Sequence, residues 1–126
     1  MNVKLLVFLF GIFLAVGCSS AKNYDSGKMY KKNVTACFYA DKFNGRKTAS
    51  GATFSNNKLT AAHRKLPFGT KVRVTNLSNN KSVVVEINDR GPFSGGFEID
   101  MAKKAYQEIS DPKSRAKMRV NIEILR

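Results

Sequence analysis

Apolar residues alternate with polar residues in several separate segments of the chain. The alternation is clearest in 118–124, and it recurs in 71–76 and 82–87. Successive side chains of a strand point to opposite faces, so each segment is predicted to be a β-strand with one buried face. The polar turn between the last two segments predicts a hairpin. Two shorter runs, 34–39 and 97–99, are rich in aromatic and β-branched residues and add further strands.

One segment has helical spacing instead. Four apolar residues recur at intervals of one turn within 101–110, and Asp100 before them is a natural N-cap. A long Gly-, Asn- and Ser-rich loop is expected over 41–57. Five or six strands, a short helix and long loops predict a mainly β fold, a small closed barrel over 34–126, because closure leaves no exposed sheet edge.

The start of the chain has a different character. Lys4 precedes an apolar run that is shorter than the roughly 20 residues of a membrane span, so 1–17 is predicted to be an export signal. Small residues precede Cys18 as in a bacterial lipobox, which predicts lipidation at Cys18; the alternative is a plain export signal with an incidental cysteine. The polar residues 18–33 are expected to tether the domain to the membrane. The absence of Asp after Cys18 favours the outer membrane, facing the periplasm.

The chain carries a net charge of +13 over 126 residues. A field of this sign attracts polyanions, and an exported protein meets envelope glycan with its carboxylated peptides, anionic lipid and acidic envelope proteins. Nucleic acid is not expected, because no RNA-binding or helix-turn-helix pattern is present. Cys37 lies in an apolar run and is expected to be a small buried residue without a disulfide partner. The domain is expected to be a monomer.

Few side chains are candidates for acid–base chemistry. His63 is the single histidine, and Asp89 and Asp100 each stand where a predicted strand ends. A rigid strand end suits a catalytic carboxylate, but Asp is equally typical of a plain turn. One histidine and one free cysteine do not supply the ligands of a metal site, and no nucleophile elbow is present. The sequence favours catalysis by a carboxylate without metal or cofactor, with His63 nearby if the barrel brings it there.

Four stretches resemble a known family in order and spacing: FYADKFNGRKTASGATF, LTAAHRKLPFGTKVRVTN, SVVVEINDRGPF and FEIDMAKKA. They are similar to the rare lipoprotein A family. The resemblance implies a six-stranded double-psi β-barrel with one or two short helices, carried by a bacterial outer-membrane lipoprotein. It also implies an endolytic lytic transglycosylase, which cuts peptidoglycan glycan strands and leaves a 1,6-anhydro product. The family trio of Glu, His and Asp falls on Ala52, His63 and Asp89.

Ala52 departs from the family pattern, because alanine has no proton to give. Either Asp89 with His63 still supports cleavage, or the domain is a non-catalytic peptidoglycan-binding or wall-loosening module. Substrate contacts are expected from the four side chains Tyr39, Arg46, Arg90 and Phe93, although the pairing of Arg90 with Asp89 has an architectural alternative. The family often appends a SPOR domain that binds denuded glycan at the septum, and this chain is expected to lack it.

Overall fold

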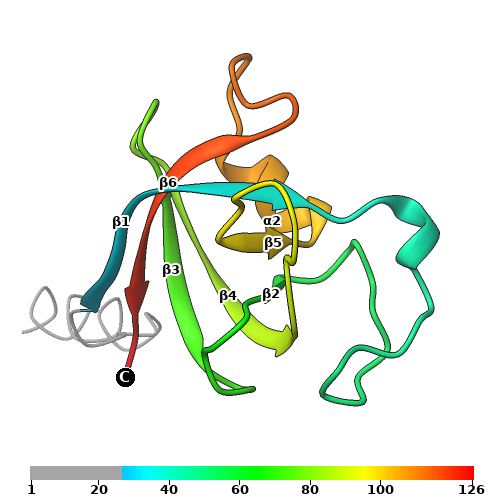
Figure 1. Cartoon of the computed structure of the whole chain (residues 1–126). Helices are drawn as coiled ribbons and strands as arrows, with labels where there is room; N and C mark the ends of the chain where they lie inside the picture. Colours follow the sequence, from blue (N-terminus) through cyan, green and yellow to red (C-terminus); the bar gives the residue numbers. More distant parts are fainter. Residues whose placement is uncertain (1–26) are drawn as a thin grey trace, which may run out of the picture.

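Six strands close into a single barrel in the computed structural model, which describes residues 27–126 (Figure 1). The predicted export signal 1–17, the lipid anchor at Cys18 and most of the tether 18–33 lie outside the described residues. Around the barrel the strands follow the order β1-β5-β2-β4-β3-β6. Their bounds are β1 Lys28–Phe38, β2 Thr60–Ala62, β3 Lys71–Asn76, β4 Ser82–Asp89, β5 Ile99–Met101 and β6 Met118–Ile124. The predicted six-stranded closed barrel is confirmed.

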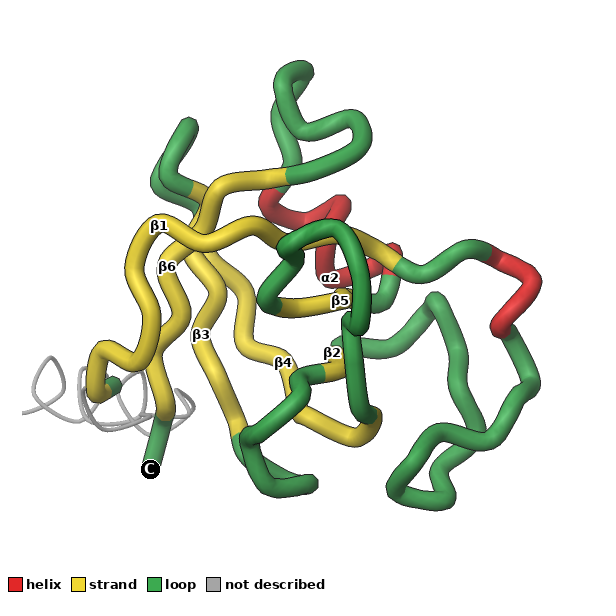
Figure 2. The backbone as a smooth tube through the Cα atoms, viewed as in Figure 1, coloured by secondary structure: helices red, strands yellow, loops and turns green. Residues whose placement is uncertain are grey.

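Helical structure is limited to two short elements within 27–126 (Figure 2). A 3-10 turn, η1, covers Asp41–Phe43, and one α-helix, α2, covers Lys103–Ile109. None of the helices in the described part of the chain has the length and hydropathy needed to cross a membrane. The loop that contains η1 extends away from the barrel, on the right of Figure 1. It returns to the barrel at β2.

The core is built by the alternating residues that the sequence singles out. In β3 and β6 every second side chain is buried, and the inward side chains of the barrel pack into one cluster. Its fully buried members include Val72, Val74, Val85, Ile87, Val120 and Ile122. Helix α2 adds Ala105, Tyr106 and Ile109 to the same cluster. Burial of these side chains at roughly 25 cal/mol per Å² of apolar surface is the main favourable term in folding.

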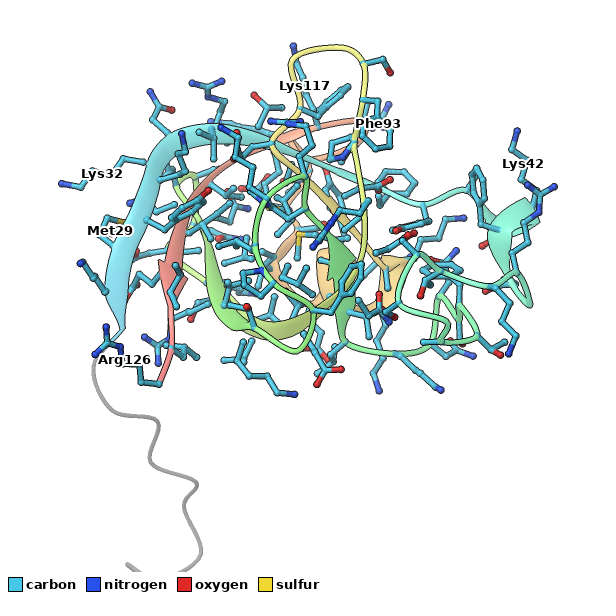
Figure 3. The ribbon with its side chains drawn as sticks, turned by 60° about the horizontal axis from the view of Figure 1, so that its bottom comes forward. Met29, Lys32, Lys42, Phe93, Lys117 and Arg126 are labelled. Carbon is cyan, nitrogen blue, oxygen red and sulfur yellow. The ribbon has the colours of Figure 1, made fainter. Side chains whose placement is uncertain are left out.

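The folded domain begins earlier than predicted, at β1 rather than at Val34. β1 pairs antiparallel with β6 from Lys28, opposite Ile124, and two register shifts interrupt the pairing before Val34. These irregularities break the period-two pattern, and Met29 and Lys32 lie on the outside (Figure 3). The segment is therefore held by backbone pairing more than by buried side chains, which explains why its polar sequence resembles a tether.

Asp100 is not the N-cap of the helix, which corrects that prediction. It lies in β5, because this strand continues to Met101 instead of ending at Ile99. The N-cap position belongs to Ala102, whose side chain has no capping group. The cap comes instead from the distant Asn56, whose Oδ1 accepts the Lys103 backbone N–H at 2.9 Å. A cap supplied across the fold leaves no local sequence signal.

Removal of residues 28–33 tests the corrected boundary. A chain that begins at Val34 loses half of β1 and leaves the end of β6 unpaired on that side. We expect its free energy of unfolding, measured by urea denaturation, to fall by at least about 2 kcal/mol relative to a chain that begins at Gly27. Equal stability of the two chains would contradict the assignment of 28–33 to the barrel.

Candidate active site

Asp89 faces away from the core because a bulge interrupts β4. Ile87 is buried, so regular alternation would turn Asp89 inward as well. The pairing with β2 places Ala61 opposite Ile87 and then Ala62 opposite Asp89, which leaves Asn88 as an extra residue. A bulge of one residue re-aims every side chain after it. The last residue of β4 therefore presents its carboxylate on the outer face of the barrel wall.

Three donors hold the Asp89 carboxylate. Oδ1 accepts the backbone N–H groups of Ala49 at 2.8 Å and of Arg90 at 2.9 Å. Oδ2 accepts the hydroxyl of Tyr39 at 2.7 Å. Because all three partners donate, Asp89 acts here as an acceptor, and its rotamer is fixed. One of the three donors comes from the long loop, so the loop and the carboxylate stabilise each other.

Tyr39 does not line an open groove. Only 7% of its surface is exposed, and its ring stacks on Phe54 with 4.1 Å between centroids. Burial, and then the hydrogen bond to Asp89, raise the pKa of its hydroxyl far above the usual value. Tyr39 is therefore a permanent donor to Asp89. The partner of its hydroxyl is this carboxylate instead of an open groove.

A second carboxylate lies in the same row of the sheet. The register pairs Cys37 with Asp100, Asp100 with Ala62, and Ala62 with Asp89, across the adjacent strands β1, β5, β2 and β4. Paired residues of neighbouring strands point to the same face. Burial raises the pKa of Asp100 to about 6, against a smaller opposing effect of the Cys37 thiol, and the charge of Asp89 raises it further. Burial also raises the pKa of Cys37, to about 12.

His63 is buried and faces a different partner. Its side chain is 1% exposed, and Nε2 lies 2.6 Å from Oε2 of Glu98. Nδ1 accepts the backbone N–H groups of Lys65 at 3.1 Å and Leu66 at 3.2 Å, so the ring proton sits on Nε2 and is donated to Glu98. Burial lowers the pKa of His63, partly offset by Glu98. The contact between His63 and Asp89 is through the backbone, N–H to carbonyl at 3.2 Å.

Sequence analysis assigned Glu98 no role in the site. It stands within a predicted strand, 35 positions from its partner His63, and no local pattern connects the two. The sequence did offer one signal, since a lone histidine on a buried segment needs a hydrogen-bond partner. Glu98 also pairs with Arg64 at 3.1 Å.

The remaining predicted contacts have separate roles. Nη1 of Arg90 donates to the carbonyls of His63 at 3.1 Å and Leu66 at 2.9 Å, and its guanidinium lies over the ring of Phe68. These contacts are architectural. Arg46 is exposed on the long loop, and Phe93 is 80% exposed (Figure 3).

The loop that carries Phe93 is tied down at its base. Nη1 of Arg64 donates to the carbonyls of Pro92 at 2.7 Å and Phe97 at 2.6 Å. A cavity of about 340 Å³ lies beside this loop and is lined by Arg64 and residues 92–97. An exposed aromatic ring on a fixed loop is available for contact with a ligand.

Ala52 lies on the long loop close to the Asp89 contact. Its carbonyl accepts the Thr48 backbone N–H at 2.7 Å, which closes a turn around Ala49. Its side chain is a methyl group, so this position brings no carboxylate to the site. Within residues 27–126, no group of three His, Cys, Asp or Glu side chains is placed to hold a metal ion.

The closed six-stranded barrel with this strand order is a double-psi β-barrel, and Asp89 lies at the end of one of its strands. The chain belongs to the lytic transglycolase family, whose model matches residues 18–122. The resemblance to rare lipoprotein A proteins is confirmed. Over 97 residues the chain is 50% identical to a Synechocystis sp. protein named "Probable endolytic peptidoglycan transglycosylase RlpA", covering 75% of this chain and 30% of that protein.

Two further comparisons agree. The "Endolytic peptidoglycan transglycosylase RlpA" of Pasteurella multocida is 52% identical over 80 residues, covering 64% of this chain and 27% of that protein. The chain thus spans about a third or less of the length of these two relatives. Among solved structures, Streptomyces papain inhibitor matches with a TM-score of 0.60 and 18% identity, covering 82% of this chain and all of that one. That likeness supports the fold alone.

The raised pKa of Asp100 makes a prediction about stability. Ionisation of Asp100 is less favourable in the folded chain than in the unfolded chain, so it lowers the free energy of unfolding. This loss of stability is absent below pH 3.8, the usual pKa of Asp, and is complete above about pH 6. We expect Asp100→Asn to raise the free energy of unfolding by about 1–2 kcal/mol at pH 8 and to leave it unchanged near pH 3.5. Urea denaturation at the two pH values measures the difference. A gain that is the same at both would show that ionisation of Asp100 is not its cause.

Proposed function

We propose that this domain is an endolytic lytic transglycosylase of the bacterial cell envelope. It cleaves the bond between N-acetylmuramic acid and N-acetylglucosamine in peptidoglycan glycan strands and leaves a 1,6-anhydro product. The observation that carries the proposal is the position of Asp89, fixed by three donors on the outer face of a family barrel. No metal or cofactor takes part.

The reaction needs one proton delivered and one removed. As the glycosidic bond breaks, the leaving oxygen takes a proton and the muramic acid ring acquires positive charge at C1. The C6 hydroxyl of the same sugar then attacks C1 and loses its proton. A carboxylate such as Asp89 stabilises the positive charge and accepts the C6 proton, since its own donors leave it as an acceptor.

His63 acts through other groups in this proposal. Its ring is buried, and both nitrogens are occupied by Glu98 and by the backbone of 65–66. The same turn supplies the carbonyls that hold Arg90, the residue next to Asp89. His63 is therefore a positioning residue that keeps the turn beneath Asp89 in place.

Several outward groups are suited to the substrate. Phe93 offers an exposed ring on which a sugar can stack. Arg46 lies on the long loop beside the ring of Phe43, where it can meet carboxylates of the glycan or its peptides. The net charge of +13 favours the same anionic polymer. We also propose that the protein is lipidated at Cys18. It is then a monomer at the outer membrane that faces the periplasm.

Asp89→Asn is the direct test. The amide keeps the shape of the side chain but cannot take a proton or stabilise a cation, so we expect the yield of 1,6-anhydro product from denuded glycan strands to fall about 10²-fold or more. Products are separated by liquid chromatography and identified by mass. Glu108→Gln, an exposed change on α2, is the matched control and retains full activity. An active Asp89→Asn domain would remove the basis of the mechanism.

The alternative function is peptidoglycan binding without cleavage, favoured by Ala52. Ala52→Glu separates the two. We expect the natural domain to cleave already, and the new Glu to change its rate by less than the roughly 10²–10⁴-fold that a missing general acid costs. A natural domain that only sediments with peptidoglycan, and that gains cleavage with Ala52→Glu, would establish the binding module instead.

A further inference from the structure

We propose that Glu98 is a positioning residue for the cleavage reaction, because its carboxylate ties together the two turns that flank Asp89 and Arg90. The inference rests on the proposed function and extends it to a residue outside the family trio. Glu98 directly precedes β5 and acts on the site through the groups that it holds. One branch of these contacts leads to Asp89, and the other leads to Phe93.

Each oxygen of the Glu98 carboxylate serves a different partner. Oε2 accepts Nε2–H of His63 at 2.6 Å, and Oε1 accepts Nη2–H of Arg64 at 3.1 Å. The side chain of Glu98 is 15% exposed and that of His63 is 1% exposed, so water competes little for the bond between them. Hydrogen bonds to an ionised acceptor are shorter and stronger than neutral ones. Two residues that are adjacent in the chain are therefore fixed by one group.

The His63 branch leads to the backbone of Asp89. Nδ1 of His63 accepts the backbone N–H groups of residues 65–66, which closes a turn around the ring. Two carbonyls of this turn accept Nη1–H of Arg90, and the backbone N–H of His63 donates to the Asp89 carbonyl. The turn thus contacts Asp89 and its neighbour directly. Its shape depends on the orientation of the imidazole, which Glu98 sets from the other side of the ring.

The Arg64 branch leads to the loop that carries Phe93. Nη1 of Arg64 donates to the carbonyls of the first and last residues of the 92–97 loop, at 2.7 and 2.6 Å. Nη2 of the same guanidinium is held by Glu98. The planar guanidinium therefore closes the base of the loop only in the orientation that Glu98 allows. This orientation sets the position of the exposed Phe93 ring and of the cavity of about 340 Å³ beside it.

The two branches together require a carboxylate at position 98. His63 and Arg64 both present donors, and a carboxylate gives each of them an acceptor oxygen. His63 cannot turn its own acceptor toward position 98, because Nδ1 is occupied by the backbone. A Gln at this position has one acceptor oxygen only. We expect that oxygen to stay with the buried His63, so that the amide nitrogen faces the more exposed Arg64 and breaks the loop branch.

The first test isolates the loop branch with Glu98→Gln and Arg64→Met. We expect each variant to raise KM for denuded glycan strands about fivefold and to leave kcat within about twofold, because the stacking ring is misplaced while Asp89 is not. The double variant should raise KM no further, since both changes break the same connection. Glu86→Gln is the matched control: it removes the carboxylate of the exposed pair with Lys71 and retains the natural KM.

The second test breaks both branches with Glu98→Leu. We expect kcat to fall about tenfold or more in addition to the rise in KM, because the turn beside Asp89 loses its support. Hydrogen exchange separates this effect from a general loss of stability. The backbone N–H of Leu66, which donates to His63, should exchange about tenfold faster in Glu98→Leu, whereas the paired amides of β6 keep nearly their natural rates.

Several outcomes would overturn the inference. Glu98→Leu with natural kcat, an additive rise of KM in the double variant, or an equal acceleration of exchange in β6 would each show that Glu98 only stabilises the fold. Glu98→Gln keeps the shape of the side chain, so the first test remains decisive if Glu98→Leu does not fold. A natural domain without 1,6-anhydro product would instead overturn the proposed function itself.

Discussion

The bulge at Asn88 is the constraint on which the site depends. β4 is otherwise a regular strand whose inward side chains fill the core, and an inward Asp89 would bury a carboxylate among apolar groups at a cost of several kcal/mol. One extra residue turns the carboxylate outward without disturbing the strand before it. The carbonyl of Asn88 also accepts the Ser50 backbone N–H at 3.3 Å, so the bulge anchors the long loop as well. This single bulge thus turns Asp89 outward and also anchors the 41–57 loop beside it.

The loop over the site is held by few contacts. Phe54 stacks on Tyr39, Asn56 caps α2, and the backbone of Ala49 bonds to Asp89. Most of the other residues in 41–57 are polar, so the order of the loop depends on these points rather than on a core. Asp89 is consequently a structural residue as well as the proposed reactive group. Substitutions that change its shape would disturb the loop, and only an isosteric amide separates the two roles.

Sequence reasoning recovered what alternation and local motifs encode. β3, β4 and β6 show the predicted period-two burial. The resemblance named Asp89 and His63 as candidate site residues, and their roles stay a prediction. Sequence reasoning failed where a residue's structural partner is distant in the chain. Asp100 was predicted to cap the helix because it directly precedes it in the sequence. The side chain that does cap the helix, Asn56, lies far from it in the chain. Glu98 was assigned no role because its contact with His63 exists only in the closed barrel. The first half of β1 resembled a tether because backbone pairing has no side-chain signature.

The loss of a carboxyl at position 52 does not change the position of Asp89, and the reason is topological. A closed barrel brings the ends of β4 and β5 beside the same short strand, so two carboxylates that are remote in sequence become neighbours of Ala62. Asp89 and Asp100 are both held by strand pairing, and Asp89 also by its three hydrogen-bond donors. An acid on the barrel wall loses less conformational freedom when the substrate binds. The barrel wall therefore fixes the position of the Asp89 carboxylate whatever side chain the loop carries at position 52.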